Sequence, residues 1–415
     1  MKAYQLSYLI LGVLLIASLA IRMLLTNYGT VWIDLGSFAA WGKLLAEKGF
    51  AAFYSLDIHI DRLPGQLYFL WLLERIFAPA SPSYQAFVYK LLPNLADLAI
   101  AIFLFSWTKQ RKNAWWGIAA AAGYLWNPFV IGTSALWGQW ESFHGLLLLV
   151  GIFVLWRRWF ATASFLFLLA LLFKPQSIVL YPLLILWVIR LPDATLRQKF
   201  AGLASGIGTT MAGAYLLALP FAWKDWAALG PLRLLFLQAR HAIDLYPYAS
   251  VNAFNLWGAT AMWTPDAARW LGLSYQWWGI VLVSLFTAGA GYLLWRNPTK
   301  EMFFASSTLI FLALFTFSTR VHERYSFLAV LMLAFILATH QRALLAFIFL
   351  SCLSALNLAY SYIWITDAQR HLFNDNIAAL LSAATVLLTL DFATTLFLKK
   401  KVAAKTPFYS LAPHQ

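Results

Sequence analysis

Long runs of apolar residues recur along the whole chain, and they constrain its fold more than any other feature. Short polar loops separate them, and their approximate bounds are 5–25, 66–79, 86–108, 115–131, 143–158, 163–173, 177–190, 200–221, 279–296, 301–318, 325–339, 341–358 and 376–397. A helix of about 20 apolar residues crosses the ~30 Å of hydrocarbon in a bilayer. The runs therefore predict an all-α, polytopic transmembrane helical bundle with external amphipathic loop helices. We expect 1–415 to form a single integral membrane domain.

The composition agrees with a membrane protein. Of the residues, 62% are hydrophobic and 11% are charged, whereas about 25% are charged in an average soluble domain. The net charge of +14 would suggest nucleic acid in a soluble protein, but here basic loops on the cytoplasmic side explain it, and we expect no nucleic-acid partner. An anionic lipid substrate would also favour basic residues near the membrane surfaces. A single cysteine, Cys352, excludes an intramolecular disulfide and a Cys/His metal pattern.

The basic residues predict the topology, since Lys and Arg are enriched in cytoplasmic loops. They gather in four short loops and a tail, as Lys109, Arg111, Lys112, Arg157, Arg158, Arg190, Arg197, Lys199, Arg296, Lys300, Lys399, Lys400, Lys401 and Lys405. Placing them inside makes 398–415 a cytoplasmic tail. It makes 26–65 a first external loop and 222–278 a long external loop. The protein would be a multi-pass protein of the inner or plasma membrane, with its site on the external or periplasmic side.

Two parts of this topology need interpretation. The run 66–79 is short and carries Glu74 and Arg75 near its end, so we interpret it as a short or interfacial helix. Both termini then lie inside and 12 spans remain, with 13 as the alternative. The pair 163–173 and 177–190 is also short and is typical of a bent or re-entrant hairpin.

The external segments hold most of the polar residues that topology does not require. Asp34 stands alone in an apolar, amphipathic setting in the first external loop. A carboxylate there can accept a proton from a hydroxyl nucleophile, although a helix N-cap is the alternative interpretation. Further along the loop, Asp57, His59 and Asp61 alternate, and this spacing puts them on one face of an extended segment. They are secondary loop acids or weak candidates for metal ligands, and solvated loop charge is the simpler interpretation.

Other external residues suit the binding of a sugar or a phosphate. Arg320 and Arg324 offer planar forks that match phosphate oxygens, with His322 between them. These three, with Lys174, are candidates for phosphate binding, whereas the candidates for sugar or acceptor binding are Gln139, Glu141, Gln176, Tyr248, Asn252, Asn255 and Glu323. Structural alternatives exist for each group. They are tryptophan anchors near 139–141, a snorkelling Lys174, an interfacial helix within 240–257, and an internal Arg–Glu pair within 319–325 that staples two helices.

Taken in order, several segments of the chain resemble the GT-C superfamily of membrane glycosyltransferases, in particular its bacterial mannosyl- or glucosyltransferase-like branch. The segments are Asp34 in the first external loop, Leu92-Pro93-Asn94-Leu95-Ala96-Asp97, Trp126-Asn127-Pro128 with Trp137-Gly138-Gln139, Phe173 to Gln176, Asn252 to Trp257, and His322 to Tyr325. The resemblance spans roughly 5–340. It is more distant to the eukaryotic enzymes that elongate lipid-linked oligosaccharides.

The resemblance implies a fold, a reaction and roles for particular residues. Such enzymes transfer a sugar from a polyprenyl-phosphate donor on the external face, so this chain would be an inverting hexosyltransferase of the cell envelope, using mannose or glucose. Asp34 matches the acidic residue of the first loop proposed as general base. Many relatives carry two adjacent acids there, whereas Leu35 follows Asp34 here. No cofactor is therefore expected, and a divalent metal is kept as the alternative.

By the same resemblance, the arginines, the histidine and the lysine would stabilise the leaving lipid phosphate, and the acceptor would be a glycan, a lipid or a protein. One alternative is a transporter or flippase of a lipid-linked or anionic substrate, since Asp97 and Asp391 lie within predicted spans. Asp97 is equally well explained by an ion pair with a nearby Lys or Arg. A second alternative is a non-catalytic assembly subunit of an envelope-polysaccharide complex, which would keep the fold without needing Asp34.

Overall fold

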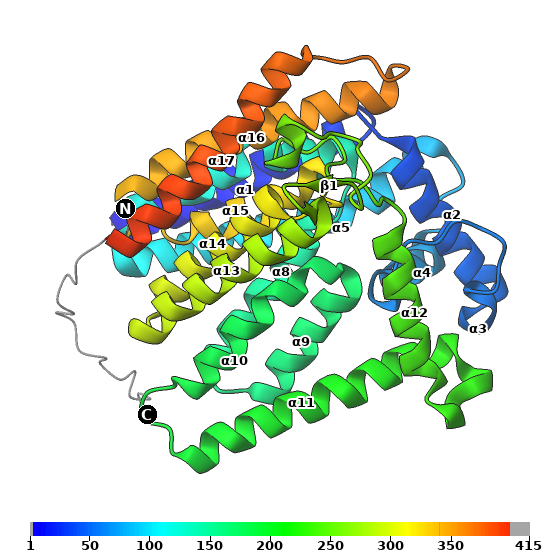
Figure 1. The fold of residues 1–415 in the computed structure, drawn as a ribbon, viewed down its shortest axis with the longest axis horizontal. Coiled ribbons are helices and arrows are strands. Elements are labelled where there is room, and N and C mark those ends of the chain that lie inside the picture. Colours follow the sequence, from blue (N-terminus) through cyan, green and yellow to red (C-terminus); the bar gives the residue numbers. More distant parts are fainter. Residues whose placement is uncertain (1–2, 340, 399–415) are drawn as a thin grey trace.

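The computed structural model describes residues 3–339 and 341–398, and this part of the chain is almost entirely helical (Figure 1). Except for Leu398, the predicted tail 398–415 lies outside the described residues. The first half contains α1 (Ala3–Leu25), α2 (Trp32–Lys48), α3 (Phe50–Phe53), α4 (Pro64–Phe77), α5 (Pro82–Arg111), α6 (Ala114–Leu125), α7 (Pro128–Ile131), η1 (Gly132–Trp137), α8 (Glu141–Trp156), α9 (Phe160–Phe173), η2 (Pro175–Leu180) and α10 (Tyr181–Ile189).

The second half begins with a long helix and a mostly irregular loop. Its elements are α11 (Leu196–Ala218), η3 (Leu219–Phe221), η4 (Trp223–Ala228), α12 (Gly230–Asp244), η5 (Trp257–Ala259), β1 (Arg269–Trp270), β2 (Leu273–Ser274), α13 (Tyr275–Arg296), α14 (Lys300–Phe317), η6 (Glu323–Ser326), α15 (Phe327–Ala334), α16 (Gln341–Thr366) and α17 (Asp375–Leu398). The two short strands pair antiparallel, with Arg269 opposite Ser274. The prediction of an all-α bundle with loop helices is confirmed.

Each predicted apolar run overlaps one helix or two consecutive helices. Within the described residues, seven helices are long and apolar enough to cross a membrane on their own: α1, α5, α11 with η3, α13, α14, α16 and α17. An eighth span results if the segments Pro128–Trp137 and Glu141–Trp156, which meet at a bend of 117°, count together. The protein is therefore a multi-pass membrane protein. The predicted 12 or 13 spans would require shorter apolar helices, such as α9 and α10, to cross as well.

The predicted basic loops lie together at one end of the bundle, which we call the basic end. The Arg111 guanidinium pairs with the Glu301 carboxylate at 2.7 Å, and the Lys300 ammonium lies over the Trp156 ring. Arg158 donates to the Pro192 carbonyl at 3.1 Å. These contacts join four loops far apart in sequence, as a shared membrane surface requires.

The polar loops gather at the opposite end, which we call the site end. There α2, α4 and α12 lie close together in Figure 1, away from the start of α1. The backbone of Gly65 at the start of α4 approaches the end of α9 so closely that a Cβ would lie 2.6 Å from the Leu172 carbonyl carbon. The short helix α4 lies among these loop helices, which fits its interpretation as a helix outside the main spans.

One sharp bend was not predicted. The π-helix η1 ends at Trp137 and is capped by Gly138, whose φ of +92° is the left-handed conformation that favours glycine. Helix α8 begins three residues after this glycine. A Cβ on Gly138 would lie 2.8 Å from the Leu35 side chain. The bend therefore needs glycine for both its backbone angle and its close packing. It carries the Trp137–Glu141 segment to the start of α2.

Candidate functional site

Asp34 lies in the first turn of α2, and its carboxylate faces the bent segment. The Trp137 indole Nε1 donates a 2.7 Å hydrogen bond to Asp34 Oδ2. The residue that caps α2 is Val31, without a side-chain hydrogen bond, so the N-cap interpretation of Asp34 is wrong. Its place in the first turn also puts the negative charge near the positive end of the helix dipole. The bend and α2 together hold this carboxylate in position.

A chain of charged groups lies beside Asp34. Glu141, at the start of α8, pairs through Oε1 with the Lys174 ammonium, and the same oxygen lies 3.5 Å from Arg324 Nε. Arg324 Nη1 also donates to the neighbouring Glu323 Oε1 at 2.7 Å. The contact of Arg324 with Glu141 links η6 to α8, so an internal Arg–Glu pair between two helices is present. All four side chains are buried. Three segments predicted from the sequence to share a site therefore meet here, from α8, the end of α9 and η6.

The groups around Asp34 decide its charge state. Burial alone would raise the pKa of the Asp34 carboxyl, but the charge of Arg324, the Trp137 hydrogen bond and the charge of Arg62 outweigh it, so the pKa lies below its usual value. The Gln139 amide, fully buried in the bent segment, contributes a smaller lowering of the same pKa. Asp34 is thus ionised at neutral pH.

Lys174 does not snorkel toward the membrane surface. Its side chain is buried and pairs with the Glu141 carboxylate, so that interpretation is wrong. Burial lowers the pKa of Lys174 to about 8, although the charge of Glu141 opposes the shift. The ammonium is therefore mostly charged at pH 7 and loses its charge as the pH rises above 8.

His322 and Tyr246 border the same region. Their rings meet edge to face with centroids 5.0 Å apart. Burial, with the charges of Arg324, Arg62 and Lys174, holds the pKa of His322 well below its usual value. The imidazole is therefore neutral at pH 7 and can donate one N–H, while the Tyr246 hydroxyl supplies a further polar group.

Arg320 does not join the phosphate-binding candidates. Its guanidinium pairs with Asp266 and with Asp244, each at 2.7 Å, and donates to the Ile243 carbonyl at 3.1 Å. These contacts fasten the long loop to the segment before η6. From the sequence, Arg320 and Arg324 had the same predicted role, but the structure separates them, because only Arg324 reaches Glu141.

The three candidates for sugar binding in the long loop contact other residues of the protein. The Asn252 side chain accepts from the Trp263 indole at 2.8 Å, and the Asn255 side chain accepts from the Gly258 amide at 2.8 Å. The Tyr248 ring packs edge to face on Trp263. Their sugar-binding role stays a prediction, but these contacts show that both asparagines are occupied in shaping the loop.

The secondary loop acids do not form one cluster. Asp57 and His59 are exposed, whereas Asp61 is half-buried and pairs with Arg62 at 2.6 Å. Among the described residues, no group of three or more His, Cys, Asp or Glu side chains is arranged to hold a metal ion. Gln176 lies half-buried in η2, two residues after Lys174.

Three residues complete the site without having been assigned to it from the sequence. Arg62 acts on Asp34, and Trp137 is its hydrogen-bond donor. Lys90, in α5, is fully buried and donates to the Thr26 carbonyl at 2.7 Å and the Leu136 carbonyl at 2.6 Å. Lys90 thereby joins the chain before α2 to the residue before Trp137. A lysine inside an apolar run was the available signal, because a buried charge requires partners.

The charged residues that suggested a transporter have structural partners. Asp97 is fully buried, lies 3.3 Å from Arg22, and accepts from Tyr124 at 2.8 Å and Ser134 at 2.6 Å. The interpretation of Asp97 as half of an ion pair is confirmed. Asp391 is exposed and lies 3.7 Å from Arg342.

Comparison with known proteins places the N-terminal part of the chain in a family. The profile of the family described as GPI transamidase subunit PIG-U matches residues 6–229, more than half of the 415 residues. This stretch contains Asp34, Trp137, Glu141 and Lys174, and it ends before η6. No curated protein matches the chain. The chain belongs to the PIG-U family of multi-pass membrane proteins.

Proposed function

We propose that this protein is an inverting glycosyltransferase that uses a polyprenyl-phosphate-linked hexose as donor. One observation carries the proposal: Asp34 is the one acid of the cluster without a direct ion pair in the described part of the chain. Asp61, Glu141 and Glu323 each pair with a cation, whereas Asp34 accepts a hydrogen bond from an uncharged indole. An ionised carboxylate held in this way is free to accept a proton.

In the proposed reaction, the acceptor hydroxyl oxygen bonds to the anomeric carbon from the face opposite the donor phosphate. The bond from that carbon to the phosphate oxygen breaks, and the lipid phosphate leaves with the electron pair. Asp34 takes the hydroxyl proton. Because its lowered pKa makes Asp34 a weak base, the proton moves late, once the hydroxyl oxygen has begun to bond and has become acidic.

The leaving phosphate needs positive charge close to Asp34. Arg324 presents a planar fork suited to phosphate oxygens, Lys174 supplies a point charge, and neutral His322 offers one N–H. In a buried site, such fixed charges stabilise a developing anion more strongly than they would in water. The GT-C resemblance supplies the identity of the donor, and the charge arrangement supports it.

Unpaired polar groups suit the hydroxyls of a sugar. Glu141 Oε2 and both polar atoms of the Gln66 amide are buried without a hydrogen bond among the described residues. Gln66 follows Gly65, which touches the backbone just before Lys174. A buried unpaired polar group costs about 1–3 kcal/mol, so a polyhydroxylated ligand that pairs these groups would gain affinity.

The family match favours a second candidate function. A subunit of a transamidase complex that acts in GPI anchoring would bind a glycolipid at this site without transferring its sugar. Such a subunit needs the cations and the amides, but it does not need an ionised Asp34.

Radiolabelled short-chain polyprenyl-phosphate sugars, presented as a panel to the purified protein in detergent, test both candidates. Transfer of label from one donor to an acceptor supports the glycosyltransferase proposal. Binding of a donor or a glycolipid without transfer would favour the subunit function. If no donor of the panel binds, the glycosyltransferase proposal fails, and if an added glycolipid does not bind either, the subunit function fails at this site as well.

A further inference from the structure

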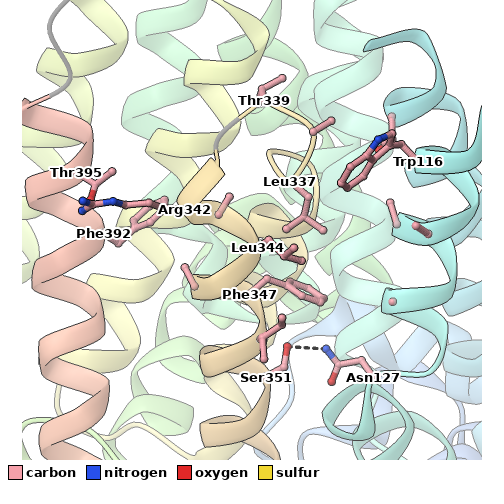
Figure 2. A pocket seen from close by; sticks show the side chains of 18 of the residues that line it. Trp116, Asn127, Leu337, Thr339, Arg342, Leu344, Phe347, Ser351, Phe392 and Thr395 are labelled. Carbon is pink, nitrogen blue, oxygen red and sulfur yellow. Dashed lines mark hydrogen bonds between the residues drawn. The ribbon is translucent and has the colours of Figure 1, made fainter. Parts of the chain in front are cut away.

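A groove of about 1140 Å³ opens on the side of the bundle toward the basic end, away from Asp34. Figure 2 shows Trp116 of α6 on one side of it and Leu337, Leu344 and Phe347 on the other. Its walls come from α6, α16 and α17, and most of its lining is apolar. Since α16 and α17 are long enough to cross a membrane, the groove faces the region that lipid chains occupy.

The length of the groove matches one leaflet of a bilayer. On α16 it runs from Arg342 to Cys352, and ten residues of helix rise about 15 Å. That is roughly half of the ~30 Å hydrocarbon thickness. At its inner end the Asn127 amide donates to the Ser351 hydroxyl at 2.7 Å, as Figure 2 shows. The groove therefore extends from the membrane surface to about the midplane.

Positive charge lies at the mouth of the groove. Lys112 is exposed, with its ammonium 5.7 Å from the Trp116 ring centre, and tryptophan favours the membrane interface. Arg342 is 69% exposed, lies 3.7 Å from Asp391 and donates to the Thr395 hydroxyl at 3.2 Å. Its guanidinium lies on the α17 side of α16, across that helix from Trp116 (Figure 2). An exposed pair of this length is weak, so the Arg342 guanidinium can turn toward a stronger anion such as a phosphate.

We propose that this groove binds a phospholipid with an anionic headgroup from the leaflet at the basic end. One acyl chain lies between α6 and α16, and the phosphate contacts Lys112 and Arg342. A zwitterionic headgroup brings a cation to the same mouth and binds less well, while a free phosphate lacks the chain that fills the apolar part. The site is separate from Asp34 and does not depend on the proposed transfer reaction.

Gly123 allows the groove to be closed without disturbing the fold. It lines the groove, and a Cβ at this position would meet nothing within 4 Å. The Leu side chain of Gly123→Leu therefore enters the groove without displacing other residues, and it occupies the space of the acyl chain. Gly208→Leu on α11 is the matched control, because its Cβ also meets nothing within 4 Å and it lies outside the groove.

Native mass spectrometry of the full chain in detergent, with added phosphatidylglycerol or phosphatidylcholine, measures the retained lipid. Cys352 lines the groove and is the sole cysteine of the chain, so its reaction with a maleimide reports occupancy independently. We expect phosphatidylglycerol to be retained at least several-fold more than phosphatidylcholine and to slow labelling of Cys352. Glycerol phosphate without acyl chains should leave the labelling rate unchanged.

Two sets of variants distinguish the contribution of the headgroup to lipid retention from that of the acyl chain. Lys112→Gln with Arg342→Gln should reduce retention of phosphatidylglycerol to the level of phosphatidylcholine, whereas Arg197→Gln with Lys199→Gln, at the same end but outside the groove, should not. Gly123→Leu should reduce retention of both lipids, unlike Gly208→Leu. Equal retention of the two lipids by wild type, or equal loss in the groove and control variants, would overturn the proposal.

Discussion

The indole of Trp137 and the carboxylate of Asp34 are 103 residues apart in sequence and joined by a 2.7 Å hydrogen bond. The bond spans the contact between the bent segment before α8 and the first turn of α2. It keeps one carboxylate oxygen in place while the charges of Arg324 and Arg62 favour the ionised form. The proposed chemistry depends on this contact, which gives the first prediction.

Trp137→Phe keeps an aromatic ring and removes the N–H donor. A hydrogen bond to a charged group contributes about 1.5–3 kcal/mol, so transfer should slow about 10- to 100-fold. The Asp34 pKa should rise at the same time, because a group that stabilises the charged form is lost. Steady-state rates measured between pH 4 and 8 check both effects. Wild-type rates throughout this pH range would exclude Trp137 as a positioning residue.

The rate should depend on pH through Lys174. Its pKa of about 8 means that the ammonium is charged below pH 8 and loses its charge as the pH rises. We expect kcat/KM to fall through an alkaline limb near pH 8. Lys174→Arg should move this limb out of the accessible range, because arginine stays charged. An identical limb in wild type and Lys174→Arg would assign the titration to another group.

Arg324 and Arg320 should respond differently to substitution. Arg324→Gln removes a cation next to Glu141 and Asp34, so we expect a loss of donor binding of at least tenfold together with slower transfer. Arg320→Gln breaks contacts with Asp266 and Asp244, so it should lower thermal stability with little effect on donor affinity. Donor titrations and melting curves for both variants distinguish these effects. A larger loss of affinity in Arg320→Gln would restore its predicted phosphate role.

The ion pair of Arg22 and Asp97 should be structural. Removing one partner leaves a buried charge unpaired, which typically costs about 3–5 kcal/mol. Arg22→Met and Asp97→Leu should each lower the melting temperature strongly, and the double variant should lose less than the sum of the two. Melting temperatures of wild type, the two single variants and the double variant, measured in detergent, form the double-mutant cycle. Simple additivity would show that the two side chains are not coupled.

Sequence alone predicted the helices and the gathering of basic loops at one end, because membrane solvation acts locally on composition and charge. Each apolar run overlaps one helix or two consecutive helices, and Arg111, Lys300 and Arg158 do meet near one surface. The same reasoning brought Glu141, Lys174 and Arg324 to one end. These features follow from short segments of sequence.

The rest depends on contacts between distant segments. Nothing near Arg320 in the sequence shows that Asp244 and Asp266 occupy it, and nothing near Lys90 shows that Thr26 and Leu136 surround it. The 117° bend depends on Gly138 packing against Leu35, a contact that only the folded chain reveals. Such pairings decide which of several similar residues form the site.

Transfer of radiolabelled hexose from the active polyprenyl-phosphate donor by wild type and by Asp34→Asn tests the central claim most directly. Donor binding is measured on the same two samples. The account predicts that Asp34→Asn binds the donor as wild type does but loses transfer at least a hundredfold. Equal transfer by the two proteins would contradict the assignment of Asp34 as the base.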